Sequence, residues 1–393
     1  MRRLQLHERF PRRFGVATLL ALMLTAPLPQ AAGAAGNGFE VLAHMNTTTG
    51  ILPWGALALA PDGRLHGTAV ESGARNNGTV FRISTSGKLT VQHAFTRKGP
   101  PGYAPYTGLI LANDGNFYGV NSNGGALLAG TVFKMTPGGD ITPVHAFDRD
   151  VESGDPTTAL VQASDGDLYG TTYYAPNRTC CGTAFRLSLA GTFETLHVFD
   201  LEDGNYPGSL VEGPDGNLYG TTWAGGAHGA GTVFRLSRAG ALTVLHDFGA
   251  TPSDGAMAGA GLLLGADGNF YGVTASGGKK GNGTAFRMTP AGDLVVLHSF
   301  AGSPDGGSQP QSALIQARNG SFYGTTRAGG PEGNGTVFRM QADGKVTTLH
   351  EFAGFDGWQP SGSLVQADDD MLYGTTAKGG DADDGVVYRI KAK

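Results

Sequence analysis

Short apolar stretches alternate with tight turns through most of the chain. In one clear example an apolar stretch is followed by the turn Asp215-Gly216-Asn217, where the Asp-Gly pair supplies the positive φ that hairpins require. Strands of this unit are predicted at residues 209–211, 218–222, 232–237 and 242–248. The pattern therefore predicts four short antiparallel strands joined by turns.

This four-stranded unit recurs with a nearly constant spacing. The Tyr-Gly pair of its second strand appears six times, and His66-Gly67 fills the same place first. The repeated tyrosines are Tyr118, Tyr169, Tyr219, Tyr271, Tyr323 and Tyr373. Successive units lie 50 to 52 residues apart, a period that is typical of β-propeller blades. The chain is therefore predicted to be all-β, a seven-bladed β-propeller with four-stranded blades.

The two ends of the repeated region complement each other. The seventh unit stops after its third strand, at residues 386–390, while residues 39–44 form an apolar strand that belongs to no complete unit. If the N-terminal segment, about residues 38–46, supplies the missing strand, every blade has four strands and the ring has no exposed edge. One propeller domain is predicted, over residues 36–393.

The composition agrees with a turn-rich β protein. The chain of 393 residues has 65 glycines and only 16% charged residues, which excludes a helical bundle or a doubly wound α/β domain. Clustered Lys or Arg residues are lacking, and the formal net charge of −5 becomes −9 without residues 1–35. Nucleic acid and anionic lipid are therefore poor partners for this surface.

The first residues have the order of a secretory signal peptide. Five arginines precede the apolar run 14–24, and a small-residue stretch, 31–36, follows it. We expect residues 1–35 to be removed and the mature protein, a monomer, to be secreted or periplasmic. No later segment is predicted to insert into a membrane.

The repeated strings resemble the Gloeo-Verruco (GloVer) tandem repeats of exported bacterial proteins. The matching strings are Asp-Gly-Asn-Leu-Tyr-Gly-Thr-Thr, as at residues 215–222, then Gly-Thr-Val-Phe-Arg at 231–235 and Leu-His-x-Phe at 245–248. The resemblance covers nearly all of residues 38–393 and implies a fold but no established chemistry. A looser similarity links Gly213-Pro214-Asp215-Gly216-Asn217-Leu218 to the propeller blades of streptogramin lyases.

Repetition separates scaffold residues from candidate site residues. Seven histidines occupy one position in the fourth strand and are interpreted as hydrogen-bonded blade residues: His44, His93, His145, His197, His246, His298 and His350. The long connections, between strands two and three and between blades, are predicted to share one face of the ring. Since loops on a rigid scaffold usually carry function, residues specific to single blades on that face are the candidates.

Aromatic residues gather in these long loops. Connections between blades contain Trp54, Tyr103, Tyr106, Tyr206 and Trp358, and the loops after strand two contain Tyr173, Tyr174 and Trp223. Flat rings beside Asp and Asn suit the apolar faces and hydroxyl edges of sugars. We therefore predict a binding protein for carbohydrate or another cell-envelope or extracellular ligand; the alternative is that these rings only pack the loops.

Two further functions stay open. A glycoside hydrolase or lyase would need paired carboxylates or an acid/base group, and the candidates are Glu71, Glu152, Glu202, Glu332 and His228. A scaffold for protein partners would need none of these. No cofactor is expected, although the acidic run 381–384 could hold Ca²⁺ through oxygen ligands.

Cys180 and Cys181 are the two cysteines of the chain, and they are adjacent. In an oxidising compartment such a pair can close into a vicinal disulfide, and a rigid bend in the loop is the favoured interpretation. A nucleophilic cysteine served by His228 is the alternative. The pair could also contribute to a zinc site, for which a fourth ligand is not evident.

Overall fold

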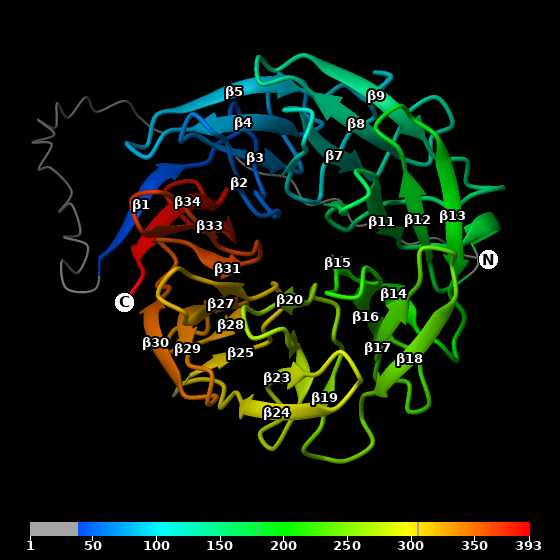
Figure 1. Ribbon diagram of the computed structural model, residues 1–393. Helices are drawn as coiled ribbons and strands as arrows, with labels where there is room; N and C mark the ends of the chain where they lie inside the picture. The colour runs from blue at the N-terminus through cyan, green and yellow to red at the C-terminus, as the bar shows by residue number, and fades with distance from the viewer. Residues whose placement is uncertain (1–37, 179, 305) are drawn as a thin grey trace, which may run out of the picture. The chain divides into compact units, whose positions relative to one another are not determined.

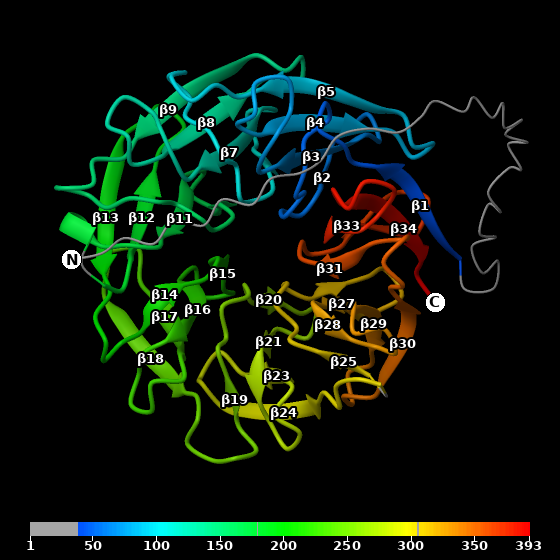
Figure 2. The ribbon, with the colours of Figure 1, turned by 180° about the vertical axis from the view of Figure 1, so that it is seen from behind.

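The computed structural model describes residues 38–178, 180–304 and 306–393, which form seven antiparallel blades around a central axis (Figures 1 and 2). This confirms the predicted all-β, seven-bladed propeller. The proposed signal peptide, residues 1–35, lies outside the described residues. No helix in the described part of the chain is long and apolar enough to cross a membrane.

Each blade is a sheet whose strands follow chain order from the channel to the rim, except that the N-terminal strand is the outermost strand of blade 7. Blade 1 consists of β2 (Ala58–Leu59), β3 (Leu65–Ala69), β4 (Thr79–Ile83) and β5 (Leu89–Ala94). Blade 2 consists of β6 (Ile110–Leu111), β7 (Phe117–Asn121), β8 (Thr131–Met135) and β9 (Ile141–Ala146). Blade 3 consists of β10 (Val161–Gln162), β11 (Leu168–Thr172), β12 (Thr183–Leu187) and β13 (Phe193–Val198).

The remaining blades repeat this order. Blade 4 consists of β15 (Val211–Glu212), β16 (Leu218–Ala224), β17 (Thr232–Leu236) and β18 (Leu242–Asp247). Blade 5 consists of β20 (Leu263–Leu264), β21 (Phe270–Thr274), β23 (Thr284–Met288) and β24 (Leu294–Ser299). Blade 6 consists of β26 (Ile315–Gln316), β27 (Phe322–Thr326), β29 (Thr336–Met340) and β30 (Val346–Glu351). Blade 7 consists of β32 (Val365–Gln366), β33 (Met371–Lys378), β34 (Val386–Lys391) and β1 (Phe39–His44).

Blade 7 is closed by the N-terminal strand, as predicted. β1 pairs antiparallel with β34 from Phe39 opposite Ile390 to His44 opposite Val386. The blue β1 and red β34 lie side by side in Figure 1. The Phe39 ring also stacks on the His350 ring of blade 6, with centroids 3.5 Å apart. Closure therefore joins the two chain ends by backbone pairing and by aromatic packing.

The repeated string Asp-Gly-Asn-Leu-Tyr-Gly builds the inside of a blade. In blade 4 the Tyr219 hydroxyl donates to Asp215 at 3.0 Å, which ties the second strand to the tight turn before it. Gly220 lies under the Phe234 ring: a Cβ at this position would be 2.6 Å from Phe234 Cζ. These residues are therefore needed for packing. The apolar core consists of seven clusters of this kind, which combine side chains of neighbouring blades.

The two classes of long loop lie on one face, because they pair with each other in every blade. In blades 1 to 3 single bridges join Ile51 to Glu71, Tyr103 to Asn123 and Gly154 to Tyr174. In blades 4 to 7 short strands replace them: β14 (Asn205–Pro207) with β16, β19 (Gly255–Ala256) with β22 (Ser276–Gly277), β25 (Gly307–Ser308) with β28 (Ala328–Gly329), and β31 (Trp358–Pro360) with β33. One 3-10 helix, η1 (Pro176–Arg178), lies in the loop of blade 3.

The connection between blades contains a left-handed residue at the same place in all seven repeats. These residues have φ between 55° and 61° and are Leu52, Ala104, Asp155, Tyr206, Met257, Gln309 and Gln359. The backbone N–H of Tyr206, for example, donates to the carbonyl of Cys181 in the preceding blade. Such a conformation is costly for a residue other than Gly and persists where surrounding bonds impose it. These backbone bonds therefore hold each connection between blades against the preceding blade.

Candidate functional site

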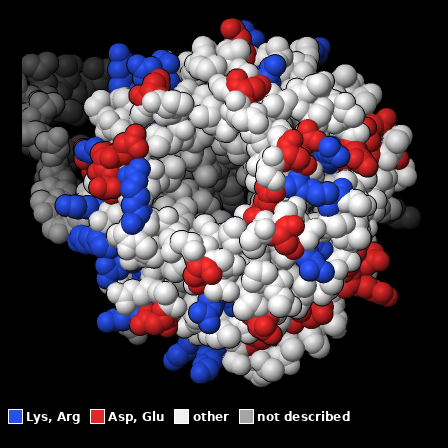
Figure 3. All heavy atoms as spheres, in the orientation of Figure 1, with Lys and Arg blue, Asp and Glu red and all other residues white. Residues whose placement is uncertain are grey.

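Two positions of each repeat flank the two inner strands of the blade on the loop face. One, the lead position, follows the left-handed residue by two places, at the start of the segment that runs to the inner strand. The other, the end position, lies three residues after the Tyr-Gly glycine of the second strand. Figure 3 shows the hollow of the channel at the centre of the ring.

The seven blades differ strongly at these two positions. Blades 1 to 4 carry aromatic residues, namely Trp54, Tyr106, Tyr173 and Trp223. Blade 5 carries only Gly259 and Ala275. Blades 6 and 7 carry polar or small residues, namely Gln311, Arg327, Ser361 and Ala377. The scaffold has seven similar blades, but its mouth has an aromatic side and a polar side.

Trp54 and Arg327 show that the two sides meet. The guanidinium carbon of Arg327 lies 5.5 Å from the centre of the Trp54 ring, within the range of a cation–π contact. Trp54 belongs to blade 1 and Arg327 to blade 6, so blade 7 lies between them. Residues of non-adjacent blades can touch only near the axis of the ring, which places both side chains at the mouth.

The polar side includes residues that the sequence reasoning missed. Arg327 Nη1 lies 3.4 Å from Gln311 Oε1, and no ion pair joins Arg327 to a carboxylate of the described residues. Ser361 Oγ is buried and has no hydrogen-bond partner among the described residues. A signal was present in the sequence, since Arg327 stands where the other blades have apolar, aromatic or Ser side chains.

Several predicted aromatic residues do lie on the inner part of the loop face. Tyr173 stacks on Tyr206 of the next blade with centroids 4.2 Å apart, and Tyr174 meets Tyr173 edge-on at 4.9 Å. Burial, followed by the neighbouring tyrosines, raises the pKa of Tyr173. Trp223 lies over Gly259 of the next blade: a Cβ there would be 2.5 Å from the indole. Tyr106 is 38% exposed.

Tyr103 and Trp358 occupy a different repeat position and pack against the loops of their own blades. Tyr103 contacts Gly124, where a Cβ would be 2.9 Å from its ring. Trp358 Nε1 donates to Asp383 Oδ1 at 2.8 Å. For these two residues the structure agrees with the interpretation that the rings pack the loops.

The acidic candidates are spread over the loop face. Glu71, Glu202 and Glu332 are exposed, and His228 is exposed at a loop tip beside Gly249. Among the described residues, no pair of these side chains is joined by a hydrogen bond. The structure therefore does not bring this set together into one acid/base site.

Glu152 needs a correction, because it does belong to a repeated pattern. Its carboxylate accepts hydrogen bonds from His145 Nε2 at 2.8 Å and from the Asp148 N–H at 3.2 Å. In the connections between other blades, an Asp that precedes a Gly does the same for three other fourth-strand histidines. These pairs are His197 with Asp203, His246 with Asp254 and His350 with Asp356. Glu152 thus holds the loop on the blade in the way that those aspartates do.

The carboxylates of the run 381–384 are engaged in the loop. Asp383 accepts from the Gly379 N–H at 2.9 Å as well as from Trp358, and these bonds keep its pKa below the usual value. Asp381 lies 3.7 Å from His44 Nδ1. Among the described residues, no group of three or more His, Cys, Asp or Glu side chains could hold a metal ion. A calcium site at this run is not proposed.

Cys180 and Cys181 form a disulfide with each other. Cys181 is buried in the core between blades 3 and 4, and its backbone has a φ of 99°. Because both sulfur atoms are bonded, the structure offers neither a thiol nucleophile for His228 nor thiolate ligands for zinc. The alternative of a nucleophilic cysteine is therefore wrong for this state of the protein.

Fold and loops define a seven-bladed propeller whose loop face differs from blade to blade. The family model of the Gloeobacter/Verrucomicrobia repeat matches residues 32–211 and 177–388. The chain belongs to this family, which confirms the resemblance inferred from the repeated strings. The likeness to streptogramin lyases concerns the hairpin turns and says nothing more about the reaction. No curated protein matches the chain.

Solved structures with a similar fold have little sequence in common with the chain. The extracellular domain of a protein described as a hybrid two-component system from B. thetaiotaomicron has a TM-score of 0.61 at 11% identity, over 91% of this chain and 41% of the other. The periplasmic gluconolactonase of Pseudomonas aeruginosa has a TM-score of 0.49 at 19% identity, over 76% of this chain and 84% of the other. The chain thus spans less than half of the first of these proteins. The likeness concerns the fold alone.

Proposed function

We propose that the chain is an exported binding protein whose channel mouth takes a carbohydrate. The observation that carries the proposal is the contact of Trp54 with Arg327 across blade 7. Export is inferred from the signal-like residues 1–35. The ligand would lie between the aromatic side of the mouth, blades 1 to 4, and the polar side, blades 6 and 7.

The chemistry of the mouth suits a sugar ring. The face of an indole excludes water from the C–H face of a pyranose, and the hydroxyl edge then needs donors and acceptors. Arg327 beside Trp54, Gln311 in contact with Arg327, and Ser361 at the lead position of blade 7 provide both kinds of group. Since Arg327 has five N–H donors and its described partners are an amide and an aromatic face, it can also receive a carboxylate of an acidic sugar.

The test is a thermal-shift screen of the mature protein against bacterial and plant oligosaccharide fragments, with each sample then analysed for new products. A ligand at one hundred times its Kd stabilises a protein by about 2.7 kcal/mol, which shifts the melting curve clearly. We expect a shift with an intact ligand, its loss in Trp54→Ala and a clear weakening in Arg327→Gln. Trp358→Ala, which removes a tryptophan that packs a loop, is the matched control and should keep the shift.

The same screen separates the alternatives. Products that disappear in Glu71→Gln or Glu202→Gln would establish a hydrolase or lyase and contradict a pure binding role. Equal loss of binding in Trp54→Ala and Trp358→Ala would place the site elsewhere on the loop face. No shift with any fragment would favour a scaffold for protein partners.

A further inference from the structure

Two outer seams between blades contain an aromatic ring stacked on the fourth-strand histidine. The first residue of the outer strand is aliphatic in five blades, namely Leu89, Ile141, Leu242, Leu294 and Val346. In two seams that residue is a phenylalanine: Phe193 stacks on His145 at 4.1 Å, and Phe39 stacks on His350 at 3.5 Å. These two imidazole side chains are only 13% and 12% exposed. The ring closes the seam.

The seam between blades 4 and 5 lacks this ring. Leu294 takes the place of the phenylalanine, and the His246 side chain is 24% exposed. The loop over this seam is also longer, because Asp254 follows His246 by eight residues, whereas Asp356 follows His350 by six. A pocket of about 560 Å³ opens here, within the usual size of small-molecule sites.

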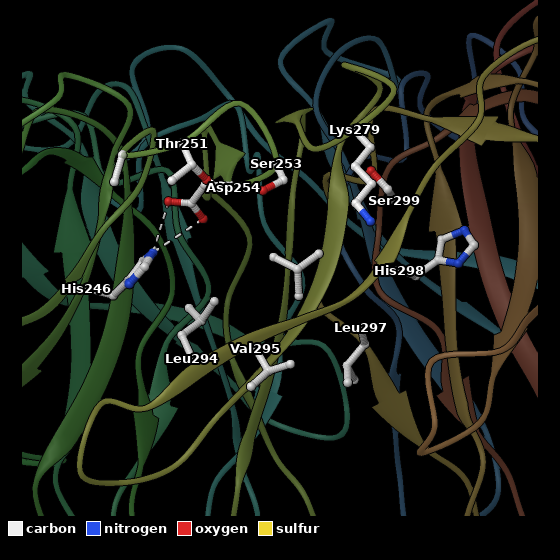
Figure 4. Close-up of a pocket in the computed structure, with 12 residues that line it drawn as sticks. His246, Thr251, Ser253, Asp254, Lys279, Leu294, Val295, Leu297, His298 and Ser299 are labelled. Carbon is white, nitrogen blue, oxygen red and sulfur yellow. Dashed lines mark hydrogen bonds and ion pairs between the residues drawn. The ribbon is translucent and has the colours of Figure 1, made fainter.

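Figure 4 shows how the pocket is arranged. The pair of His246 and Asp254 lies on one side, and Lys279 lies on the other side with Ser299 near it. Side chains of the outer strand β24, among them Val295 and Leu297, provide the apolar wall. The pocket is distinct from the channel mouth, since none of the mouth residues lines it.

The two charged side chains of the pocket, Asp254 and Lys279, differ in their interactions with the rest of the protein. Asp254 is already engaged by His246 and by the N–H groups of Gly249 and Gly255. No ion pair joins Lys279 to a carboxylate of the described residues, and Ser299 Oγ is buried without a hydrogen-bond partner among them. The side of the pocket away from Asp254 therefore offers an ammonium group and a hydroxyl to an anion.

We propose that this pocket binds a small ligand that carries an aromatic ring and a carboxylate. The ring stacks on the open face of His246, as Phe193 and Phe39 stack on His145 and His350 in the closed seams. The carboxylate pairs with Lys279 and accepts a hydrogen bond from Ser299. The two Phe–His stacks of the protein are the model for how the ligand's aromatic ring would lie, and the Lys279 ammonium group is the counter-ion for its carboxylate.

The probe is 3-phenylpropionate, titrated into the mature protein by calorimetry. Two analogues separate the contributions: 3-cyclohexylpropionate keeps the charge without the aromatic face, and 3-phenylpropanol keeps the ring without the charge. We expect saturable binding of 3-phenylpropionate and at least fivefold weaker binding of each analogue. Leu294→Phe fills the space beside His246 from inside the protein and should abolish binding, while Lys279→Met should weaken it about tenfold.

Two control variants make the result specific. Lys280→Met changes the neighbouring lysine, which does not line the pocket, and should leave binding unchanged; Trp54→Ala removes the channel-mouth ring and should do the same. The melting temperature of Leu294→Phe shows that the variant is folded. Unchanged affinity in a folded Leu294→Phe protein would overturn the proposal, and so would an absence of saturable binding or equal losses for Lys279→Met and Lys280→Met.

Discussion

The seam between blades 6 and 7 and the seam between blades 4 and 5 carry the same repeated strings but differ in structure. The first is closed by Phe39 on His350, with Asp356 at 3.0 Å from the imidazole. The second has Leu294 and a longer loop, the distance from His246 Nε2 to the Asp254 carboxylate is 3.3 Å, and the seam holds a pocket. The strings shared by all blades thus define the scaffold. The length of the connection over the seam and the residue beside the histidine differ between the two seams, and the pocket is found under the longer connection.

The closed seam between blades 6 and 7, unlike the open one, also includes the strand that closes the propeller. The Phe39 ring contacts Phe352 and Tyr388 as well as His350, and its strand supplies the outer edge of blade 7. A gap in this seam would open the ring of blades, whereas the gap at His246 lies between two blades that are already joined by continuous chain. The comparison therefore predicts different consequences for the same kind of change.

The largest effect is expected from removal of residues 38–46, which deletes β1. The edge of β34 would lose its partner, and the core between blades 6 and 7 would lose Phe39 and Val41. We expect a loss of about 5 kcal/mol or more, a large part of the stability of a folded domain. Chemical denaturation of the truncated and full mature proteins measures it. Unchanged melting of the truncated protein would contradict the closure described above.

Periodicity made the fold predictable from sequence. Strands at residues 218–222, 232–237 and 242–248 were expected and are found as β16, β17 and β18, because the turn signals and the apolar stretches recur seven times. The closing strand was predictable for the same reason, since residues 39–44 could be matched to an incomplete repeat. Each of these inferences depends on local sequence and on a count of strands.

The site was less predictable because it depends on distances between residues far apart in the chain. The contact of Trp54 with Arg327 joins the first and sixth blades, and small residues in blade 7 leave room for it. The partner of Glu152 could not be recognised as His145 before the loop was placed. The pocket beside His246 lies under a longer connection, and Leu294 resembles the aliphatic residues at the same position of four other blades, so the sequence alone does not indicate it.

A middle-sized effect is expected when the residues of the two seams are exchanged. Phe39→Leu removes the stacked ring and leaves a gap, for a loss of about 1–3 kcal/mol. Leu294→Phe adds a ring to a space that exists already, so it should be neutral or stabilising by about 1 kcal/mol. Guanidinium titrations of both variants give the two values.

Phe193→Leu separates the two contributions in the closed seams. Phe193 stacks on His145 between blades 2 and 3, which are joined by continuous chain, so this contact does not close the propeller. We expect its loss to be smaller than that of Phe39→Leu, and the difference measures what closure adds. If Leu294→Phe costs as much as Phe39→Leu, the space beside His246 is not an empty version of the closed seam, and the comparison fails.

The smallest effect concerns pH and the histidines of the rim. Burial lowers the pKa of His298, which lines the open pocket, and burial followed by the charge of Arg75 lowers the pKa of His93. The unfolded chain, in which a histidine titrates near pH 6.5, therefore binds more protons than the folded protein just below that pH. Stability is present above about pH 6.5 and declines as the pH falls toward the lowered values.

Denaturant midpoints measured between pH 7.5 and pH 5 should reveal this decline. In His298→Gln, as in His93→Gln, the curve should be flatter over this range, because one group that takes up a proton only on unfolding is gone. Asp254 does not interfere, although burial alone would raise its pKa: the bonds from His246 and Gly255 outweigh burial and keep the value below the usual one, so its own contribution is lost only in more acidic solution. The pKa of His298 also responds to the Gly344 backbone of blade 6, which places its imidazole toward that seam, so 3-phenylpropionate should leave the difference between the wild type and His298→Gln unchanged. A ligand-dependent change in that difference would show that the bound molecule reaches the His298 imidazole and would contradict its placement beside His246.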